Sequence, residues 1–256
     1  MTSLRFVQIT DTHLSDRAEG TLRGVNTAQT LAAVVDCARA REPRIDGILA
    51  TGDLSHDGGT PSYRRLIRAL TPLDAPVYCL PGNHDALSVF GCVLKGARVQ
   101  SGGRILPEGW QLVLLDTAVP GAVHGHLRPR ELERLEAALQ EHPDRHALIC
   151  LHHQPVPVGS AWVDRLMLDN AAALFAVLDR HPQVRGILWG HVHQEFDGSR
   201  NGVRLLASPS SCVQFKPGCD DFTLDDRPPG YRWLDLRPDG RIDTGVVYVT
   251  REQNPL

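Results

Sequence analysis

The sequence predicts an α/β fold. Short apolar runs alternate with segments of helical periodicity over the first two thirds of the 256 residues, and the last third contains mostly strand patterns. No repeat, low-complexity tract or linker interrupts the chain, so a single domain is expected over residues 1–256. Hydrophobic residues make up 42% and charged residues 22%, a balance typical of a globular enzyme.

Strands are predicted wherever a short apolar run is bounded by polar or turn residues. In chain order the runs are 6–9, 47–50, 77–80, 112–115, 147–151, 186–189, 203–207, 231–236 and 246–249. Asn201-Gly202 and Asp239-Gly240 are typical of tight hairpin turns between the later strands. The polar, Pro-rich segment 217–230 is expected to be a long loop, and loops of that length are often functional.

Four helices are predicted from start and stop signals. Asn26 begins a capping box for a helix that runs toward Pro43. Pro61 and Pro129 stand at the first turns of two further helices, and a fourth is expected over residues 170–179.

Charge and cysteine content limit the partners and the compartment. A net charge of -3 without a basic stripe argues against a nucleic-acid partner. No apolar stretch is long enough for a membrane span or a signal peptide, so no membrane partner and a cytoplasmic location are expected. The six cysteines form no C-x-x-C pair, although Cys212 and Cys219 remain an alternative metal or redox pair.

Polar clusters of metal-ligand type follow five of the predicted strands. They are Asp11-Thr12-His13, Gly52-Asp53, Gly82-Asn83-His84-Asp85, His152-His153 and Gly190-His191-Val192-His193. Ligands of α/β sheets bind beyond the carboxyl ends of the strands, so we expect these clusters to meet at one rim. Each cluster alone is a weak signal, but five in this order, each at a strand end, indicate a metal site.

The spacing within the clusters suggests how the side chains converge. In extended chain, residues i and i+2 point the same way, so Asp11 with His13, and His191 with His193, are each expected to face one region. The glycines before Asp53, Asn83 and His191 are expected to let the backbone approach the metals. Oxygen and imidazole ligands without cysteine favour Zn, Fe or Mn.

This ordered set of motifs resembles the calcineurin-like metallophosphoesterase superfamily, whose pattern is D-x-H, G-D, G-N-H-[DE], H and G-H-x-H. The segments ITDTHL, LRGVNT, ATGDLSHD, LPGNHD, LHHQPVPVGS, WGHVHQE and ASPSSCVQFKPGC are, more narrowly, similar to bacterial class III cyclic nucleotide phosphodiesterases, over nearly the whole chain. The resemblance implies a four-layer α-β-β-α sandwich of two mixed sheets flanked by helices. It also implies hydrolysis of 3′,5′-cyclic AMP (cAMP) to 5′-AMP.

The resemblance also implies a ligand set for two di- or trivalent metal ions, with Fe and/or Mn favoured and Zn possible. One metal is assigned to Asp11, His13, Asp53 and His193, and the other to Asp53, Asn83, His152 and His191. Asp53 bridges the two. His153, the second histidine of its pair, is left to a supporting or substrate contact.

Two metals about 3.5–4 Å apart would clamp the phosphate and generate a hydroxide that attacks phosphorus in line with the leaving oxygen. The catalytic residues are then His84, Asp53 and Asn83, with His84 next to the leaving oxygen. Asp85 is expected either to orient the His84 imidazole or to cap a helix.

Further residues are expected around the substrate. The resemblance places His13, Asn83, His84 and His193 near the phosphate. Arg23 and Asn26 could reach the phosphate or ribose, although Asn26 also suits a helix cap. Residues 208–222 could form the purine pocket, in which Phe215 would stack on the base.

Alternative functions remain open at this point. The residues after Asp53 are Leu54 and Ser55 rather than an Arg-Gly pair, which argues against a protein phosphatase. The metal motifs alone do not separate cAMP from 2′,3′-cyclic nucleotides or glycerophosphodiesters. A non-catalytic metal-binding scaffold is disfavoured because every ligand position is filled. The oligomeric state is left open between a monomer and a homodimer.

Overall fold

The computed structural model describes residues 2–249. Two six-stranded mixed sheets form its centre. The first sheet has the strand order β16 (Ile242–Tyr248), β15 (Gly230–Leu236), β1 (Leu4–Gln8), β4 (Gly47–Thr51), β5 (Val77–Leu80) and β6 (Val99–Ser101). The second sheet has the order β11 (Phe196–Arg200), β12 (Val203–Ala207), β10 (Val184–Trp189), β9 (His146–Cys150), β8 (Trp110–Leu114) and β7 (Gly103–Ile105).

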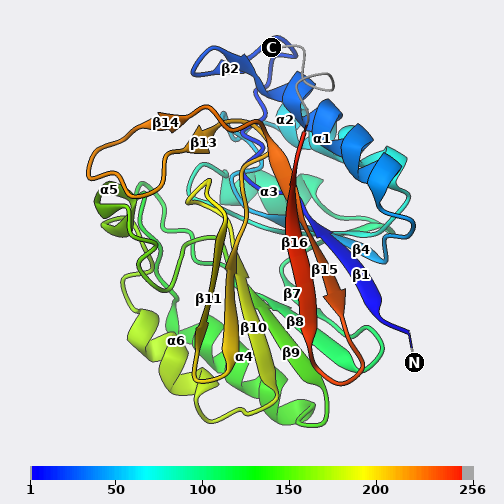
Figure 1. Cartoon of the computed structure of the whole chain (residues 1–256), viewed down its shortest axis with the longest axis vertical. Helices are drawn as coiled ribbons and strands as arrows, with labels where there is room; N and C mark the ends of the chain where they lie inside the picture. Colours follow the sequence, from blue (N-terminus) through cyan, green and yellow to red (C-terminus); the bar gives the residue numbers. More distant parts are fainter. Residues whose placement is uncertain (1, 250–256) are drawn as a thin grey trace.

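Helices cover the outer face of each sheet, so the chain forms the four layers α-β-β-α (Figure 1). The first sheet is covered by α1 (Thr27–Arg41), α2 (Thr60–Leu70) and α3 (Leu87–Val93), with a 3₁₀ turn η1 (Thr71–Leu73) after α2. The second is covered by α4 (Pro129–Glu141), α5 (Ala161–Asp164) and α6 (Ala171–Leu178). The inner faces share a dry core that includes Phe6 and Leu49 from one sheet and Trp110 and Leu148 from the other. The predicted sandwich is therefore confirmed.

All nine predicted strands and four predicted helices are present, with shifts of a few residues at their ends. Asn26 caps α1, because its side chain accepts hydrogen bonds from the backbone N–H groups of Ala28 and Gln29. The strand patterns did not indicate β11, whose sequence FDGSR contains Gly and charged residues and lies at a sheet edge. The helix α3 was also not predicted, because its sequence contains Val and Gly, which are poor helix formers.

Two short hairpins stand outside the sheets. One consists of β2 (Thr21–Leu22) and β3 (Val25–Asn26), and the other of β13 (Gln214–Phe215) and β14 (Leu224–Asp225). Figure 1 shows β2 and the β13–β14 hairpin at the same end of the molecule. The predicted loop at 217–230 therefore contains a strand, which folds its first part back onto β13.

The parallel strands fix where the polar clusters lie. β1, β4 and β5 run parallel in the first sheet, and β9 and β10 in the second. Hydrogen bonds between the two sheets hold the carboxyl ends of these strands together. For example, Gln8 Nε2 at the end of β1 donates to the carbonyl of Trp189 at the end of β10, at 3.0 Å. Among the described residues, no helix is both long and apolar enough to cross a bilayer.

Candidate metal centre

The loops after β1, β4, β9 and β10 bring six of the predicted ligands together at this rim. Asp11, His13 and His193 offer ligand atoms that all lie within 4.8 Å of one another, and so do Asp11, Asp53 and His152. His152 Nε2 is 3.4 Å from Asp53 Oδ2, and His13 Nε2 is 3.7 Å from the same oxygen. Asp53 thus lies between two groups of imidazoles, where the bridging assignment requires it.

His191 and the seventh ligand, Asn83, join this group through their neighbours. The His191 ring lies 5.1 Å from the His152 ring, between centroids, and the His191 backbone N–H donates to Asp11. Asn83 lies in the loop after β5, which packs on Asp53 because the backbone N–H of the next residue, His84, donates to Asp53 Oδ1 at 2.9 Å. Five loops from both sheets therefore supply the predicted set.

Five of these ligands have left-handed backbone conformation. The φ angles are 52° for Asp11, 42° for His13, 50° for Asp53, 65° for His191 and 47° for His193. The expectation that the i and i+2 pairs converge through extended chain was therefore wrong. A left-handed conformation costs free energy for residues other than glycine, so it persists only where contacts with the rest of the fold stabilise it. Such residues concentrate at functional sites. Here they turn the chain sharply at each strand end so that alternate side chains face the centre.

The glycines at the strand ends leave room for the ligands themselves. A Cβ added to Gly82 would lie 2.2 Å from Asp53 Oδ1, and one added to Gly52 would lie 2.3 Å from His152 Nδ1. At Gly190 the nearest atoms belong to Thr10 and Asp11. The close approach predicted from these glycines is thus an approach of one ligand loop to another.

Backbone carbonyls fix the orientation of two imidazoles. His152 Nδ1 lies 2.8 Å from the carbonyl oxygen of Thr51, and His193 Nδ1 lies 2.7 Å from that of Val213. Because a carbonyl only accepts, each Nδ1 carries a proton, and each Nε2 is left to face the centre as the ligand atom. This is the arrangement typical of metal-binding histidines.

Several atoms at the centre are buried without a hydrogen-bond partner. They are His13 Nδ1, Asn83 Oδ1, His152 Nε2 and His191 Nε2. His193 Nε2 moreover lies 3.2 Å from His13 Nε2, where one imidazole N–H can donate to the other nitrogen, and 3.5 Å from the Asp11 carboxylate. In their deprotonated forms these nitrogens and the carboxylate would repel each other unless a cation lay between them. The residues therefore fit a pair of metal ions.

The pKa shifts follow from the same crowding. Burial lowers the pKa of His13 and of His191 to about 3, so both imidazoles are neutral and able to coordinate near pH 7. Burial also disfavours the charged form of His152, but the adjacent Asp53 outweighs this and raises its pKa to about 9. Without a metal, a proton on His152 thus balances the Asp53 carboxylate.

His153 lies close enough to His152 and His191 to share a metal site with them, but both of its ring nitrogens have other partners. Its Nδ1 lies 2.8 Å from Thr117 Oγ1, and its Nε2 lies 3.1 Å from the carbonyl oxygen of Val123. Both nitrogens are thus engaged by the segment after β8, which supports a supporting role for His153 and leaves the ligand position to His152.

Both roles suggested for Asp85 were wrong. Its carboxylate accepts hydrogen bonds from the backbone N–H groups of Leu54, Ser55 and Gly82, and from the hydroxyl of Tyr63. It does not cap α3, whose N-cap is Ala86. Asp85 instead ties the loop that contains Asp53 to the loop that contains Asn83.

His84 lies at the open side of the centre. It is exposed, and its ring makes an edge contact with His13 at a centroid distance of 4.9 Å. His56, to which the sequence analysis gave no role, stacks on His84 at 5.1 Å with 22° between the rings. Burial lowers the pKa of His84, and the adjacent Asp53 only partly offsets this. His84 can therefore donate a neutral N–H to a ligand at the centre.

A pocket of about 230 Å³ opens from the metal centre toward the two short hairpins. Five of the seven predicted substrate residues line it: His13, Arg23, His84, His193 and Phe215. Phe215 stacks flat on His193 at 4.0 Å, so its ring supports a ligand imidazole. Asn26 is not among the lining residues, and its Oδ1 is engaged in capping α1. Phe222, named only as the end of the predicted purine segment, stands at the mouth of this pocket.

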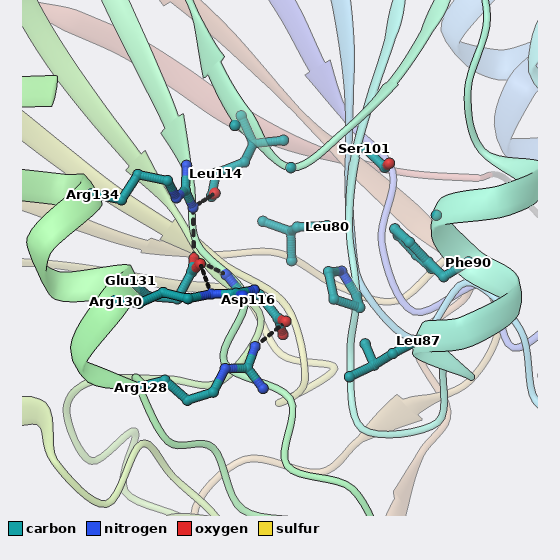
Figure 2. Close-up of a pocket in the computed structure, with 14 residues that line it drawn as sticks. Leu80, Leu87, Phe90, Ser101, Leu114, Asp116, Arg128, Arg130, Glu131 and Arg134 are labelled. Atoms are coloured by element: carbon teal, nitrogen blue, oxygen red, sulfur yellow. Dashed lines mark hydrogen bonds and ion pairs between the residues drawn. The ribbon is translucent and has the colours of Figure 1, made fainter.

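A larger hollow of about 810 Å³ lies on the other side of the loop after β5 (Figure 2). Leu80, Leu87 and Phe90 form one wall. Its charged groups form ion pairs, as between Arg128 and Asp116 and between Arg134 and Glu131 at 2.6 Å, although Arg128 Nε has no hydrogen-bond partner. At the metal centre, by contrast, four buried polar atoms without a partner gather beside two carboxylates, so that centre is the better candidate for chemistry.

The alternative pairing of Cys212 and Cys219 gains no support. Cys212 is buried with its Sγ 3.4 Å from the carbonyl oxygen of Asp11. All six cysteines are free, and neither of these two belongs to the metal-ligand groups found among residues 2–249.

A family model described as "Calcineurin-like phosphoesterase" matches residues 4–195. The chain belongs to the calcineurin-like phosphoesterase family. Members of this family use a dinuclear metal site, which fits the clusters of His and Asp described above. The predicted family membership is confirmed.

Individual relatives and solved structures are consistent with this family membership. The chain is 47% identical to the "3',5'-cyclic adenosine monophosphate phosphodiesterase CpdA" of Pseudomonas aeruginosa, over 96% of this chain and 90% of the relative. It is 44% identical to the protein of the same name from Escherichia coli, over 95% and 89%. A dimetal phosphatase from Danio rerio superposes with a TM-score of 0.66 at 16% identity, over 98% of this chain and all of that one, and so shows the shared fold.

Proposed function

We propose that this family member is a dinuclear metal phosphodiesterase that hydrolyses cAMP to 5′-AMP. The observation that carries the proposal is the group of Asp and His side chains gathered around Asp53, in which backbone carbonyls orient His152 and His193 so that Nε2 faces the centre. The identity to curated cAMP phosphodiesterases over nearly the whole chain supports the substrate. We assign one metal ion to Asp11, His13, Asp53 and His193, and the other to Asp53, Asn83, His152 and His191.

Two bound metal ions would supply Lewis acidity and an activated water to the phosphate. The chain's own residues hold the substrate for this chemistry. We assign the phosphate to the space beside His13 and His193, which line the pocket, with Asn83 as its third neighbour, and His84 lies next to His13 on the open side. Its neutral N–H donates toward the leaving O3′, where a positioned donor is worth roughly 10²–10⁴-fold in rate.

Stacking holds the rings of His84 and His56 in place. His56 lies beside both His84 and His13, at centroid distances of 5.1 and 5.8 Å. Its backbone N–H donates to the carbonyl of Leu14, which anchors the loop after β4 to the loop after β1. His56 is thus assigned to the positioning of His84.

The donor set is compatible with three metals. Imidazole nitrogen and carboxylate or amide oxygen, without thiolate, suit Fe, Mn and Zn, and we propose Fe and/or Mn because the resemblance to class III cyclic nucleotide phosphodiesterases favours them. A cytoplasmic location would match the six free cysteines.

The test compares substrates and metals with purified protein. Hydrolysis of cAMP, 2′,3′-cyclic AMP and a glycerophosphodiester is measured after chelation and after return of Mn or Fe. We expect cAMP to be turned over with the highest kcat/KM, and only with metal present. A preference for 2′,3′-cyclic AMP or for the glycerophosphodiester would assign the site to the alternative substrate, and undiminished activity after chelation would overturn the dinuclear centre.

A further inference from the structure

We propose that the nucleobase of the substrate binds between the Phe222 ring and the Arg23 guanidinium, at the outer end of the pocket that leads from the metal centre. The inference rests on the proposed function and adds the part of the site that favours a nucleotide over other phosphodiesters. Arg23 and Phe222 belong to different hairpins, β2–β3 and β13–β14, which meet over this pocket.

The pocket has two chemically distinct ends. His13, His84 and His193 form the inner end, at the metal centre. Away from these histidines the lining is apolar and aromatic with one cation: Val213 and Phe215 lie beside His193, and Leu22, Arg23 and Phe222 belong to the two hairpins. A cyclic nucleotide has the same division, since its phosphate is anionic and its base is flat and aromatic.

Phe222 is the aromatic ring available to a base. Its exposed fraction is 42%, in a loop whose exposed side chains are mostly polar, with Leu224 as the other large apolar one. The loop is anchored on both sides of this ring, because Lys216 N donates to the carbonyl of Thr223 and Gly218 N donates to Ser160 Oγ. Phe215, by contrast, uses one face to stack on His193. An exposed aromatic ring on an anchored loop is a suitable platform for stacking.

Arg23 covers this ring in the structure. Its guanidinium carbon lies 5.0 Å from the centroid of the Phe222 ring. At this distance the guanidinium and the ring contact each other, so a base enters between them only when the exposed Arg23 side chain moves outward. Guanidinium planes and aromatic rings both stack on nucleobases, and the base would then be held from both sides. Stacking of this kind reads the flat face of the base, so we expect cyclic GMP to use the same contact as cAMP.

The backbone at Arg23 gives an independent reason to assign it a function. Arg23 and Gly24 are the central residues of a tight hairpin turn, with φ of 54° and 86°. Asn, Asp or Gly is preferred at the first of these positions. The hairpin between β11 and β12 has the same turn with the preferred pair Asn201-Gly202, at 51° and 83°. A long side chain in this strained position suggests selection for what the side chain does.

Four variants test the proposal: Phe222→Leu, Phe222→Tyr, Arg23→Asn and the remote turn control Asn201→Arg. For each, kcat and KM are measured for cAMP and for methyl 4-nitrophenyl phosphate, a diester without base or sugar, together with the melting temperature. We expect Phe222→Leu to raise the KM for cAMP about tenfold, with a much smaller effect on methyl 4-nitrophenyl phosphate. Phe222→Tyr should restore the KM, because the aromatic face returns.

Arg23→Asn should also raise the KM for cAMP while it raises the melting temperature, because Asn suits the turn. Asn201→Arg should lower the melting temperature and leave the KM for cAMP unchanged. If Phe222→Leu and Arg23→Asn keep the KM for cAMP within about twofold of the wild type, or affect both substrates equally, the base contact is wrong and the proposed function stands. A wild-type protein that cleaves methyl 4-nitrophenyl phosphate but not cAMP would overturn the proposed function, and this inference with it.

Discussion

Replacement of Asp53 by Asn removes the bridging charge with little change in shape. Asp53 Oδ1 accepts the His84 N–H at 2.9 Å, and the amide oxygen of Asn can keep this bond. The other oxygen lies 3.4 Å from His152 Nε2 and 3.7 Å from His13 Nε2, where an amide NH₂ would replace a ligand by a donor. The fold should therefore persist while both metal positions lose the same ligand.

The size of the effect follows from these distances. A cation coordinated by either imidazole lies within about 4 Å of the carboxylate, where each pair of unit charges interacts by about 4 kcal/mol at an effective dielectric constant of about 20. That corresponds to about 10³-fold in affinity for each unit of metal charge, so Asp53→Asn should bind both ions at least that much more weakly. Turnover of cAMP should fall in parallel.

The assay is metal content per chain after desalting, together with the rate on cAMP and a melting curve. Asp36→Asn makes the same chemical change on the outer face of α1, where the side chain is 70% exposed, and should match the wild type in all three. A folded Asp53→Asn protein with two metals per chain and normal turnover would refute the bridging assignment.

The remaining predictions concern the donor, the close contacts and the protons of the same centre. His84→Ala should keep both metals but lower the rate on cAMP by roughly 10²–10⁴-fold. The rate on a diester with a 4-nitrophenolate leaving group should fall much less, because that leaving group needs no proton. If the variant loses metal in proportion to its rate, His84 is a metal ligand instead. Gly82→Ala would place a Cβ 2.2 Å from Asp53 Oδ1 and 2.4 Å from its backbone N, so metal content and rate should both fall by about tenfold or more. In Gly91→Ala, on α3, the Cβ meets nothing within 4 Å, and any effect as large as that of Gly82→Ala would argue against a steric cause. Because the pKa of His152 is raised to about 9, its imidazole is protonated at pH 7.5, and metal binding should release that proton. The release should disappear as the pH rises through 9, because His152 is then already neutral before the metal binds. Calorimetric titration in buffers of different ionisation enthalpy measures the release; His152→Gln should reduce it, and an unchanged release would contradict the assignment.

The ligand set was predictable because it depends on local pattern and one topological rule. Each cluster follows an apolar run of strand length, and parallel strands present their carboxyl ends at one rim. The backbone geometry was not predictable in the same way. Asp and His tolerate left-handed φ better than most residues, but nothing in Asp11-Thr12-His13 distinguishes that conformation from extended chain. The pattern therefore predicted which side chains converge and gave the wrong reason for their convergence.

Residues whose roles depend on distant contacts were not assigned from the sequence. His56 gains its role from a ring that lies 28 positions further along the chain, and Phe222 from a hairpin almost 200 positions earlier. Their only local signals were a histidine three residues after the bridging Asp53 and an aromatic residue in a polar loop. Neither signal separates a functional side chain from a solvated one until the fold brings the partner to it.

Asp85 connects two ligand loops of the first sheet, the loop after β4 and the loop after β5. Its carboxylate accepts the N–H groups of Leu54 and Ser55 after the bridging Asp53, and that of Gly82 before Asn83. Burial and the adjacent Asp53 nevertheless raise the pKa of Asp85 to about 7, because two carboxylates share one dry environment. Metal ions at the centre would offset the charge of Asp53, and with it part of the cost of ionising Asp85. Metal binding and the clamping of these loops are therefore expected to reinforce each other, since each favours the charge state that the other requires.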